Sequence, residues 1–347
     1  MTERKNIGAF TEEQHKMMLR NNLTNVMNNT VYNSGLNAQV GLEQTITSLT
    51  NIISKVVRTL YYTVPNKLSD YVKIEVGQGA YAQKLLQYAT NIVGNEGKQG
   101  IINPTANGIN KDANSSIQVG SFTLDNNFWR WTYNVSNELV NMAQVNAQTF
   151  SIIEENEIAR KKIWDLMLQD AFFIGLDDGK SYGILNQPNV NVNTTVKAKK
   201  FSAMTDSEFQ AFLAQVGNAY GTNNAYTMTF DTMLVPTAEF FSLTQPFGQY
   251  GLNRLQVLED AMKRITGGNF KVLHAKYGEN ANANKNGGRT VLYNSNADNL
   301  CAFLPVPYTP MPLFPQGALD LISQAHGQFI TPFAKRTTSM LYLDEQV

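Results

Sequence analysis

The sequence predicts an α+β protein, and three observations support that prediction. Residues 148–174 carry apolar side chains three and four positions apart, which is the spacing of a long amphipathic helix. Residues 117–135 alternate aromatic with polar side chains, a pattern typical of a β-strand. After residue 200, short helical and strand-like segments follow one another as far as Leu343.

The predicted helix at residues 148–174 has two faces of different character. Its apolar stripe, expected to face a core, consists of Ile152, Ile153, Ala159, Ile163, Leu166, Met167, Phe173 and Ile174. The opposite face, expected to be solvated, consists of Glu154, Glu157, Arg160, Lys161, Asp165 and Gln169. Gly175 ends the helix as a left-handed cap. At about 1.5 Å per residue the helix would be on the order of 40 Å long, which suits a bracing element.

A second amphipathic helix is predicted near the N-terminus, at residues 42–60. Its apolar stripe includes Leu49, Ile53 and Val56. The segment after it reaches Pro65, which disfavours helix at the preceding residue. We interpret residues 1–63 as an arm whose apolar stripe packs against another surface, of the same subunit or of a neighbour.

Residues 68–93 and 117–135 read as two strand-like limbs, with a possible helix around residues 81–88. Between them lies a long polar segment, residues 94–116, which is rich in Gly and Asn and has almost nothing to bury. Loops longer than about 12–15 residues without structure are uncommon and usually have a function. The two limbs and their tip therefore predict an extended hairpin that reaches for a partner.

Capping signals define the helices beyond residue 200. Thr205 and Glu208 form a capping box for a helix at residues 205–220, and Gly267 closes a helix at residues 252–266. The other predicted features are a short helix at 236–243, strands at 228–235, 270–274, 290–293 and 300–304, a flexible tip at 278–288, and a proline run made of Pro305, Pro307, Pro310, Pro312 and Pro315.

The composition restricts the possible partners. The chain of 347 residues has 28 basic and 28 acidic residues, so no global basic charge predicts nucleic-acid binding. Only 16% of the residues are charged, against about 25% in an ordinary soluble domain. Amide and hydroxyl side chains take their place. A near-neutral surface of this kind favours association with other protein chains.

Cysteine and histidine usage predicts neither a disulfide framework nor a metal site. Cys301 is the single cysteine, and His15, His274 and His326 are too scattered for the usual ligand spacings. The first ten residues lack an apolar signal core, and no apolar run approaches the 18 or so residues of a membrane span. We expect no cofactor, no metal and no membrane contact.

Two motifs resemble catalytic or nucleotide-binding signatures. Gly179-Lys180-Ser181-Tyr182-Gly183 matches G-x-S-x-G, which would make Ser181 a nucleophile. That elbow needs a strand before the serine and a helix after it, whereas here a long helix precedes it. Asp177 and Asp178 before Gly179 are interpreted as a turn.

The second motif is G-x-G-x-x-A at residues 77–82, after a strand-like run. A dinucleotide site would need a βαβ unit downstream, and a glycine- and asparagine-rich loop follows instead. We interpret these glycines as a turn or bulge. Lys197, Lys199 and Lys200 form a small basic cluster, interpreted as a solvated face.

The order of these segments resembles the major capsid proteins of tailed bacteriophages, which have the Hong Kong 97-like fold. The most specific local likeness is Phe173-Ile174-Gly175 leading into Tyr182-Gly183-Ile184-Leu185-Asn186-Gln187-Pro188-Asn189, similar to a turn after the spine helix of many such proteins. The resemblance divides the chain into an N-terminal arm (1–63), an extended loop or E-loop with flanking strands (64–137), a peripheral P-domain with the spine helix (138–200), an axial A-domain (201–292), and return strands to the P-domain with the C-terminus (293–347).

This resemblance implies a structural role and no catalysis. Copies would form hexamers and pentamers of an icosahedral head that encloses the genome, assembled in the cytoplasm of a host bacterium. The implied partners are other copies, a portal, separate scaffolding or decoration proteins, and packaged double-stranded DNA bound without sequence specificity. The arm and extended loop would lie across neighbours, which makes these candidate interface residues: Leu49, Ile53, Val56, Gly94, Lys98, Asn103, Pro104 and Lys111.

Two alternatives stay open from the sequence. An encapsulin-like nanocompartment shell would share the fold and would enclose cargo enzymes instead of a genome. A soluble hydrolase using Ser181 would belong to a different class and would work as a monomer.

Overall fold

The computed structural model describes residues 60–93, 116–136, 151–176, 178–248, 251–282, 287–317 and 319–346. All of them belong to one compact unit, residues 60–347. The predicted helix at residues 42–60, apart from Leu60, lies outside the described residues. So does the loop tip at residues 94–115. The predicted α+β class is confirmed, since helices and sheets form separate layers within this unit.

The long helix is α5, Ile152–Phe173, and Ser151 caps it by accepting a hydrogen bond from the Glu154 N–H. Gly175 follows with φ +88°, as predicted. The predicted buried stripe is wrong except at Phe173, which is buried. The buried residues of α5 are Arg160, Trp164, Leu168, Gln169, Ala171, Phe172 and Phe173.

The helix is therefore rotated relative to the prediction, because two residues placed on the solvated face find polar partners inside. Arg160 donates to the Tyr308 hydroxyl and to Ser323 Oγ. Gln169 accepts the Val64 N–H and donates to the Tyr277 hydroxyl. Buried polar groups are tolerated when they are hydrogen-bonded in this way.

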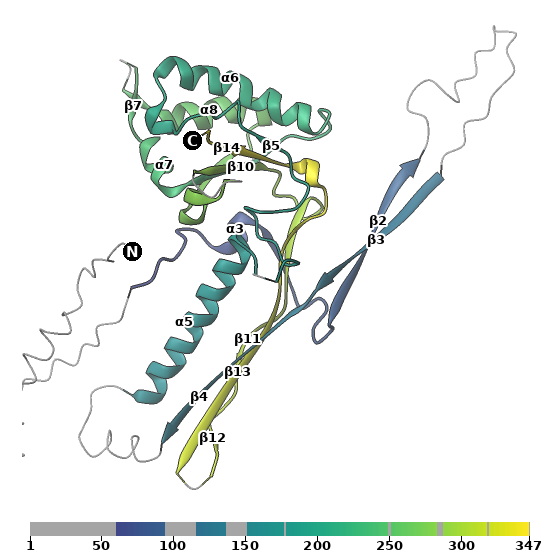
Figure 1. The fold of residues 1–347 in the computed structure, drawn as a ribbon, viewed down its shortest axis with the longest axis vertical. Coiled ribbons are helices and arrows are strands. Elements are labelled where there is room, and N and C mark those ends of the chain that lie inside the picture. Colours follow the sequence, from purple (N-terminus) through teal and green to yellow (C-terminus); the bar gives the residue numbers. More distant parts are fainter. Residues whose placement is uncertain are drawn as a thin grey trace, which may run out of the picture. The chain divides into compact units, whose positions relative to one another are not determined.

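Sheet 1 contains five strands: β1 Lys73–Val76, β11 Leu300–Pro310, β13 Asp320–Ala334, β12 Phe314–Pro315 and β4 Asn127–Ser136. β13 is its central strand and pairs antiparallel with β11, β12 and β4, while β1 adds to β11 in parallel. Figure 1 shows α5 running alongside β4, β11 and β13. Alternation along the strands directs every second side chain towards α5.

A close approach fixes α5 against sheet 1. The Trp164 ring lies over Gly327 of β13, where an added Cβ would come within 2.5 Å of the indole. The same ring packs edge-to-face on Trp129, at 5.0 Å between centroids, and on Phe329. Glycine is therefore required at position 327 to admit the helix.

Three prolines of the predicted proline run, Pro305, Pro307 and Pro310, lie within β11, which extends six residues beyond the predicted strand end. β1 pairs with β11 only as far as Leu304, so the later residues of β11 form no hydrogen bonds with β1 along that edge. The ladder to β13 also shifts register there. Proline is tolerated at such edges and bulges, because no ladder hydrogen bond needs its missing N–H.

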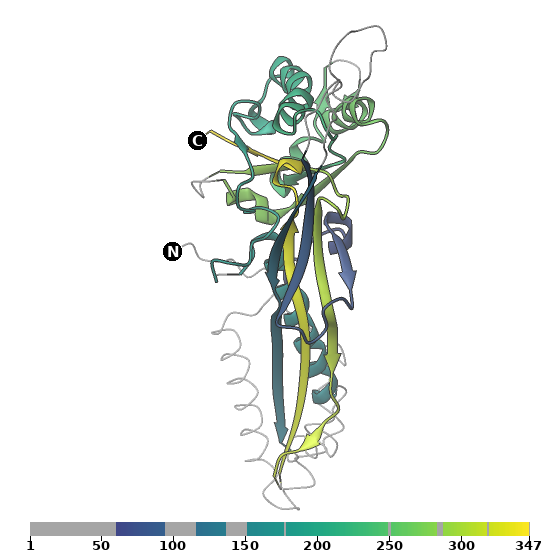
Figure 2. The same ribbon diagram turned by 90° about the vertical axis from the view of Figure 1, so that its right-hand side faces the viewer.

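The predicted hairpin is present over part of its two limbs, as β2 Lys84–Val93 and β3 Ser116–Asp125, with ten paired positions. The rest of the limbs was wrongly assigned to it, because β1 and β4 pair with β11 and β13 in sheet 1. The helix suggested around residues 81–88 is wrong, since these residues enter β2 from a turn. A short helix does occur earlier, as α3 Leu68–Tyr71. In Figure 2 the hairpin strands cross in front of the strands of sheet 1.

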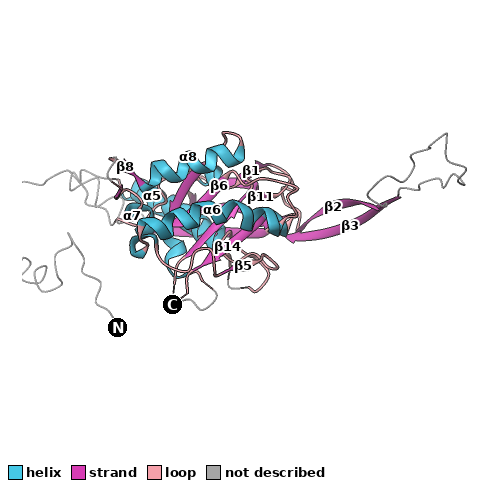
Figure 3. Cartoon of the chain, turned by 90° about the horizontal axis from the view of Figure 1, so that it is seen from above, coloured by secondary structure: helices cyan, strands magenta, loops and turns pink. Residues whose placement is uncertain are grey.

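Sheet 2 has the order β5 Val192–Asn193, β14 Met340–Asp344, β10 Arg289–Tyr293, β6 Thr232–Pro236 and β9 Lys271–Ala275. Two helices cover one face, α6 Asp206–Asn223 and α8 Arg254–Thr266, as Figure 3 shows. The other face shares a core with the C-terminal end of α5. The remaining elements are η1 Phe201–Ala203, α7 Thr237–Ser242, β7 Pro246–Phe247, β8 Leu252–Asn253, η2 Lys276–Asn280 and η3 Thr337–Ser339.

Local signals in this region are confirmed. Thr205 and Glu208 form the predicted capping box of α6, and Gly267 ends α8 with φ +78°. The predicted flexible tip is wrong for its first residues, because η2 packs against β6 and Gly278 is buried. Residues 283–286 of that tip lie outside the described residues.

Candidate intersubunit surface

The base of the β2–β3 hairpin is fixed on the face of sheet 1 that points away from α5. Leu85 and Leu124 pack with Cys301, Phe303 and Ile330 in a small core of their own. Among the hairpin residues whose burial the structure describes, none belongs to either of the two larger cores. A two-stranded hairpin is marginally stable by itself, so its outer part requires a further contact.

An amide network sets the direction of the hairpin. Asn126, between β3 and β4, donates from Nδ2 to the Ala82 carbonyl at 2.8 Å and to Gln328 Oε1 at 3.3 Å. Gln328 Oε1 also accepts the Tyr81 N–H at 2.8 Å. The Gly77–Ala82 motif is the turn that feeds β2, with Gly77, Gly79 and Tyr81 all at positive φ. The turn interpretation is confirmed, since this motif leads into the antiparallel β2–β3 hairpin and not into a βαβ unit.

The hairpin face turned away from sheet 1 carries exposed apolar side chains. Because paired residues share a face, Leu86 and Tyr88 lie opposite the face that holds Leu85 and Leu124. Leu86 is 49% exposed and Tyr88 is 67% exposed. Their neighbours across the ladder, Thr123 and Ser121, are exposed as well.

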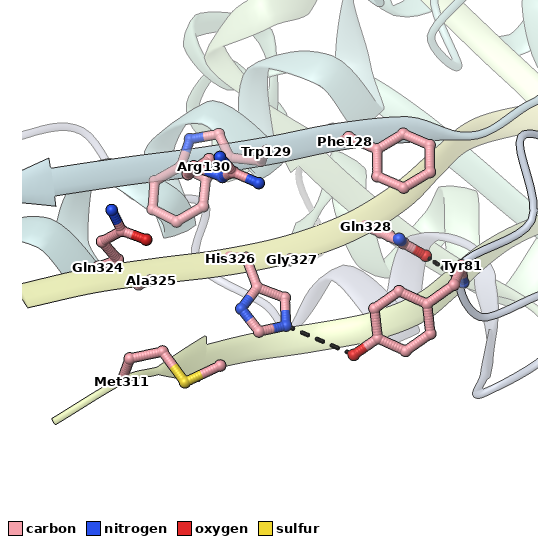
Figure 4. Close-up of a pocket in the computed structure, with 10 residues that line it drawn as sticks. All are labelled: Tyr81, Phe128, Trp129, Arg130, Met311, Gln324, Ala325, His326, Gly327 and Gln328. Carbon is pink, nitrogen blue, oxygen red and sulfur yellow. Dashed lines mark hydrogen bonds between the residues drawn. The ribbon is translucent and has the colours of Figure 1, made fainter.

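A second exposed region lies on the outer face of sheet 1, beside the hairpin base. An open groove of about 460 Å³ is lined by Tyr81, Phe128, Trp129, Arg130, Met311, Gln324, Ala325, His326, Gly327 and Gln328. Figure 4 shows the Tyr81 hydroxyl directed at His326 Nε2, 3.5 Å away, with Phe128 above Gln328. We call this region the outer groove. It combines aromatic surface with amide groups and offers no cluster of acids or bases for catalysis.

β4 forms one border of the outer groove and is an edge strand. Its recorded pairing in the described chain is with β13, which leaves its other edge open. Phe128 is 59% exposed, and Trp131 stacks on Trp129 while remaining partly exposed. Long edge strands with exposed aromatic side chains are sites of pairing with another chain.

All eight interface residues predicted from the sequence lie outside the described residues: Leu49, Ile53, Val56, Gly94, Lys98, Asn103, Pro104 and Lys111. Their role stays a prediction. Phe128, Leu86 and Tyr88 lie on exposed surfaces and were not predicted from the sequence. The alternation in residues 117–135 signalled a two-faced strand, but it could not tell which face a core would cover.

The structure does not favour the hydrolase alternative at Ser181. Its Oγ donates to Asp178 Oδ2 at 2.7 Å, and Asp178 Oδ1 accepts the backbone N–H groups of Lys180 and Ser181. Burial opposes ionisation of Asp178, but these hydrogen bonds lower its pKa. Asp178 is thus the turn residue predicted, while Asp177 lies outside the described residues. A helix precedes the serine, not the strand that a nucleophile elbow requires.

The interpretation of Lys197 as part of a solvated cluster is wrong. Lys197 is 0% exposed and forms ion pairs with Glu239 and Glu345, whereas Lys199 is exposed and pairs with Glu208. Adjacent lysines in the sequence carry no signal that separates these two environments.

Within the described part of the chain, no group of three or more His, Cys, Asp or Glu side chains is placed to hold a metal ion. No described helix has the length and apolar character needed to cross a membrane. Cys301 is buried, and burial raises the pKa of its thiol.

Comparison with known proteins agrees with this architecture. A family profile described as major capsid protein matches residues 105–345. No curated protein matches the chain. Among solved structures, the capsid of Myoviridae Phage XM1 superposes with a TM-score of 0.70 at 11% identity, over 86% of this chain and 97% of that chain.

Two further structures share the fold. The capsid of an empty GTA particle gives a TM-score of 0.55 at 14% identity, over 91% of this chain and 99% of that chain. A chain of Mycobacterium phage Ogopogo gives 0.51 at 10% identity, over 87% and 98%. The Hong Kong 97-like fold predicted from the order of segments is confirmed. Because the family profile covers most of the chain and the fold agrees with it, this protein belongs to the major capsid protein family, the structural proteins of the virion.

Proposed function

We propose that this chain is the shell subunit of a tailed double-stranded DNA bacteriophage. It would assemble into hexamers and pentamers of an icosahedral head that encloses the genome. It would do so without acting as an enzyme on any other molecule. The observation that carries the proposal is the β2–β3 hairpin, a ten-pair ladder held in the described chain by packing at its base.

The hairpin and the outer groove complement each other chemically. The free hairpin face offers Leu86 and Tyr88, and the outer groove offers Phe128 together with the amides of Gln324 and Gln328. A hairpin from one copy can bury its apolar side chains on such a surface of a neighbour, and the open edge of β4 can add backbone hydrogen bonds. This arrangement supplies the contact that the isolated hairpin lacks.

The finer organisation follows the resemblance. The chain would divide into an arm (1–63), an extended loop (64–137), a P-domain (138–200), an A-domain (201–292) and return strands (293–347). Its further partners would be a portal, scaffolding or decoration proteins, and packaged DNA contacted without sequence specificity. Assembly would take place in the cytoplasm of the host bacterium.

The test is a double substitution on the free hairpin face, Leu86→Asp with Tyr88→Asp. Both side chains are exposed in the subunit, so its free energy of unfolding should change by less than about 1 kcal/mol. Shell yield, measured by sedimentation and negative-stain microscopy, should fall at least tenfold, because the docked hairpin would bury two unpaired charges.

Leu86→Met with Tyr88→Phe is the matched control. It keeps the apolar area and should assemble as the unmodified chain does. Normal shells from the aspartate variant would contradict the proposed hairpin contact.

The contents of purified particles separate the phage shell from the nanocompartment alternative. Nuclease-protected double-stranded DNA inside particles isolated from their natural source supports the phage head. A stoichiometric co-purifying enzyme without DNA would support the nanocompartment instead.

A further inference from the structure

A buried cluster in sheet 2 has the composition of a self-condensing site. Lys197 lies between β5 and η1, and its Nζ is 2.8 Å and 3.0 Å from the two carboxylate oxygens of Glu239. The same Nζ is 2.9 Å from Glu345 Oε1, at the end of β14. All three side chains are at least nine-tenths buried, and the Phe201 ring lies 5.0 Å from Nζ.

The charges in this cluster do not balance without a proton. One amine faces two carboxyl groups, and an unpaired charge in a buried site is costly. Burial raises the pKa of Glu239 to about 7. Burial also opposes ionisation of Glu345, but its hydrogen bond with Glu239 and the charge of Lys197 lower its pKa to about 2. The raised pKa makes Glu239 the acid of the pair that takes up a proton more readily.

The backbone around the cluster is adapted to these carboxyl groups. The Gly288 N–H donates to Glu345 Oε2 at 2.8 Å, and the Phe201 N–H donates to Glu239 Oε2 at 3.4 Å. A Cβ at position 288 would lie 2.8 Å from Glu239 Oε1 and 3.0 Å from Glu345 Oε1. A larger residue at position 288 would require these carboxyl groups to shift away from the backbone. A donor on one carboxyl oxygen polarises that carbonyl, as in an oxyanion hole.

We propose that Lys197 and Glu345 condense to an intramolecular amide (isopeptide) bond between Nζ and Cδ, with Glu239 carrying the protons. The three groups that the reaction requires are in contact with one another. They are a nucleophilic amine, a polarised carboxyl group and a second acid that touches both. Fixed contact of this kind replaces a bimolecular encounter and raises the effective concentration of the reacting groups by several orders of magnitude.

The step balances without any further reactant. The cluster begins with the Lys197 ammonium, the Glu345 carboxylate and protonated Glu239. Glu239 passes its proton to Glu345 Oε1 and takes one from Nζ, which leaves a neutral amine beside a neutral carboxylic acid. Nζ then attacks Cδ, and the Gly288 N–H stabilises the negative charge on Oε2.

The intermediate collapses by losing water. Glu239 gives its proton to Oε1 and then takes the excess proton from Nζ, the Cδ–Oε1 bond breaks, and water leaves. The products are the amide, water and protonated Glu239. The reaction removes an ammonium and a carboxylate from a buried site, which favours the neutral product.

The neighbouring Arg289–Asp344 pair of sheet 2 gives an internal contrast. It is equally buried and forms two hydrogen bonds, at 2.6 Å and 2.7 Å. It cannot condense in the same way, since a guanidinium keeps its proton in proteins. The bond at Lys197 would tie the segment before η1 to the end of β14, and so close a long loop around sheet 2.

Mass spectrometry of tryptic peptides tests the proposal directly, on both purified subunits and assembled shells. The expected product is peptide 181–199 joined to peptide 337–347, one water lighter than their sum, with no cleavage after Lys197. Glu239→Gln keeps the amine and the acceptor but removes the proton carrier, and the linked peptide should fall at least tenfold. Lys197→Arg should abolish it.

The peptides of the unmodified chain test the proposed bond even if a variant fails to fold. If trypsin cleaves after Lys197 and peptide 337–347 appears free in both subunits and shells, the proposal is overturned. A linked peptide at full yield in folded Glu239→Gln would overturn the role of Glu239.

Discussion

Sheet 2 is covered on both faces, whereas sheet 1 is covered by α5 on one face and carries only the hairpin base on the other. Sheet 2 lies between the α6–α8 layer and the core shared with α5, and its ion pairs are buried. Sheet 1 presents the outer groove, with Phe128, Arg130 and Gln324 exposed along β4 and β13.

This difference in coverage indicates that sheet 2 stabilises the subunit, whereas the outer face of sheet 1 is available for contact with another copy. Charges inside sheet 2 are fixed by hydrogen bonds, so removing one partner affects the folding of the subunit. Aromatic side chains on the open face of sheet 1 contribute little to the subunit and remain available to another copy. Variants in sheet 2 should therefore fail at folding, and variants on the outer face of sheet 1 should fail at assembly.

The largest effect is expected for Arg289→Ala in β10. The guanidinium binds Asp344 through two hydrogen bonds and the Leu185 carbonyl through a third, and it stacks over Tyr342. Its loss removes the charge and the two hydrogen bonds that Arg289 supplies to a buried carboxylate, at a cost of about 3–5 kcal/mol. Urea unfolding measures this cost. A double change with Asp344→Asn should recover part of it, and a loss below about 1 kcal/mol would contradict the assignment.

A smaller effect is expected for Gly327→Ala in β13, where the added Cβ meets the Trp164 ring. Overpacking of this kind costs about 1–3 kcal/mol. Thermal unfolding of the subunit provides the measurement. Trp164→Phe in the Gly327→Ala background makes room for the methyl group, so the second change should cost less there than in the unmodified chain. Additive costs would show that the two residues are not in contact.

Phe128→Thr should affect assembly and leave the subunit intact. The ring is exposed and threonine suits a strand, so the free energy of unfolding should change by less than about 0.5 kcal/mol. The yield of shells, read by sedimentation, should decrease several-fold. Phe128→Tyr preserves the ring and should assemble normally. A large loss of subunit stability in Phe128→Thr would break the distinction between the two sheets.

The smallest effect is expected from the titration of His274 in β9. Burial against Phe240, which stacks on it at 4.2 Å, lowers the pKa of His274 below its usual 6.5. The unfolded chain therefore binds the proton more readily, so stability should decrease as the pH falls below 6.5 towards the folded pKa. His274→Asn should show a flatter dependence in unfolding measured between pH 7.5 and about 5. If the stability of His274→Asn depends on pH as that of the unmodified chain does, other titratable groups cause the dependence.

Short-range signals in the sequence proved dependable. The Thr205–Glu208 capping box and the Gly267 cap occur as predicted because both depend on groups within one helical turn. The hairpin limbs were recognisable from alternation, and the order of elements predicted the fold. These features depend on neighbours close in the chain, which a single sequence contains.

The buried face of α5 and the environment of Lys197 could not be predicted in the same way. Arg160 and Lys197 are charged, so their hydropathy predicts exposure, yet each is buried beside partners distant in the chain. Ser323 and Glu345, two of those partners, follow more than 145 residues later. Only the folded sheet brings them together.

The sequence by itself determined the class of fold, the long helix and the two-faced strands, because hydrophobic period and capping act locally. The tertiary structure decided which face of each strand is covered. Periodicity shows that the two faces of a strand differ, but it does not show which element packs on each face. In β4, one face packs against α5 and the other lines the outer groove. The same reason applies to the buried acids around Lys197, whose chemistry exists only once β14, α7 and the segment before η1 meet.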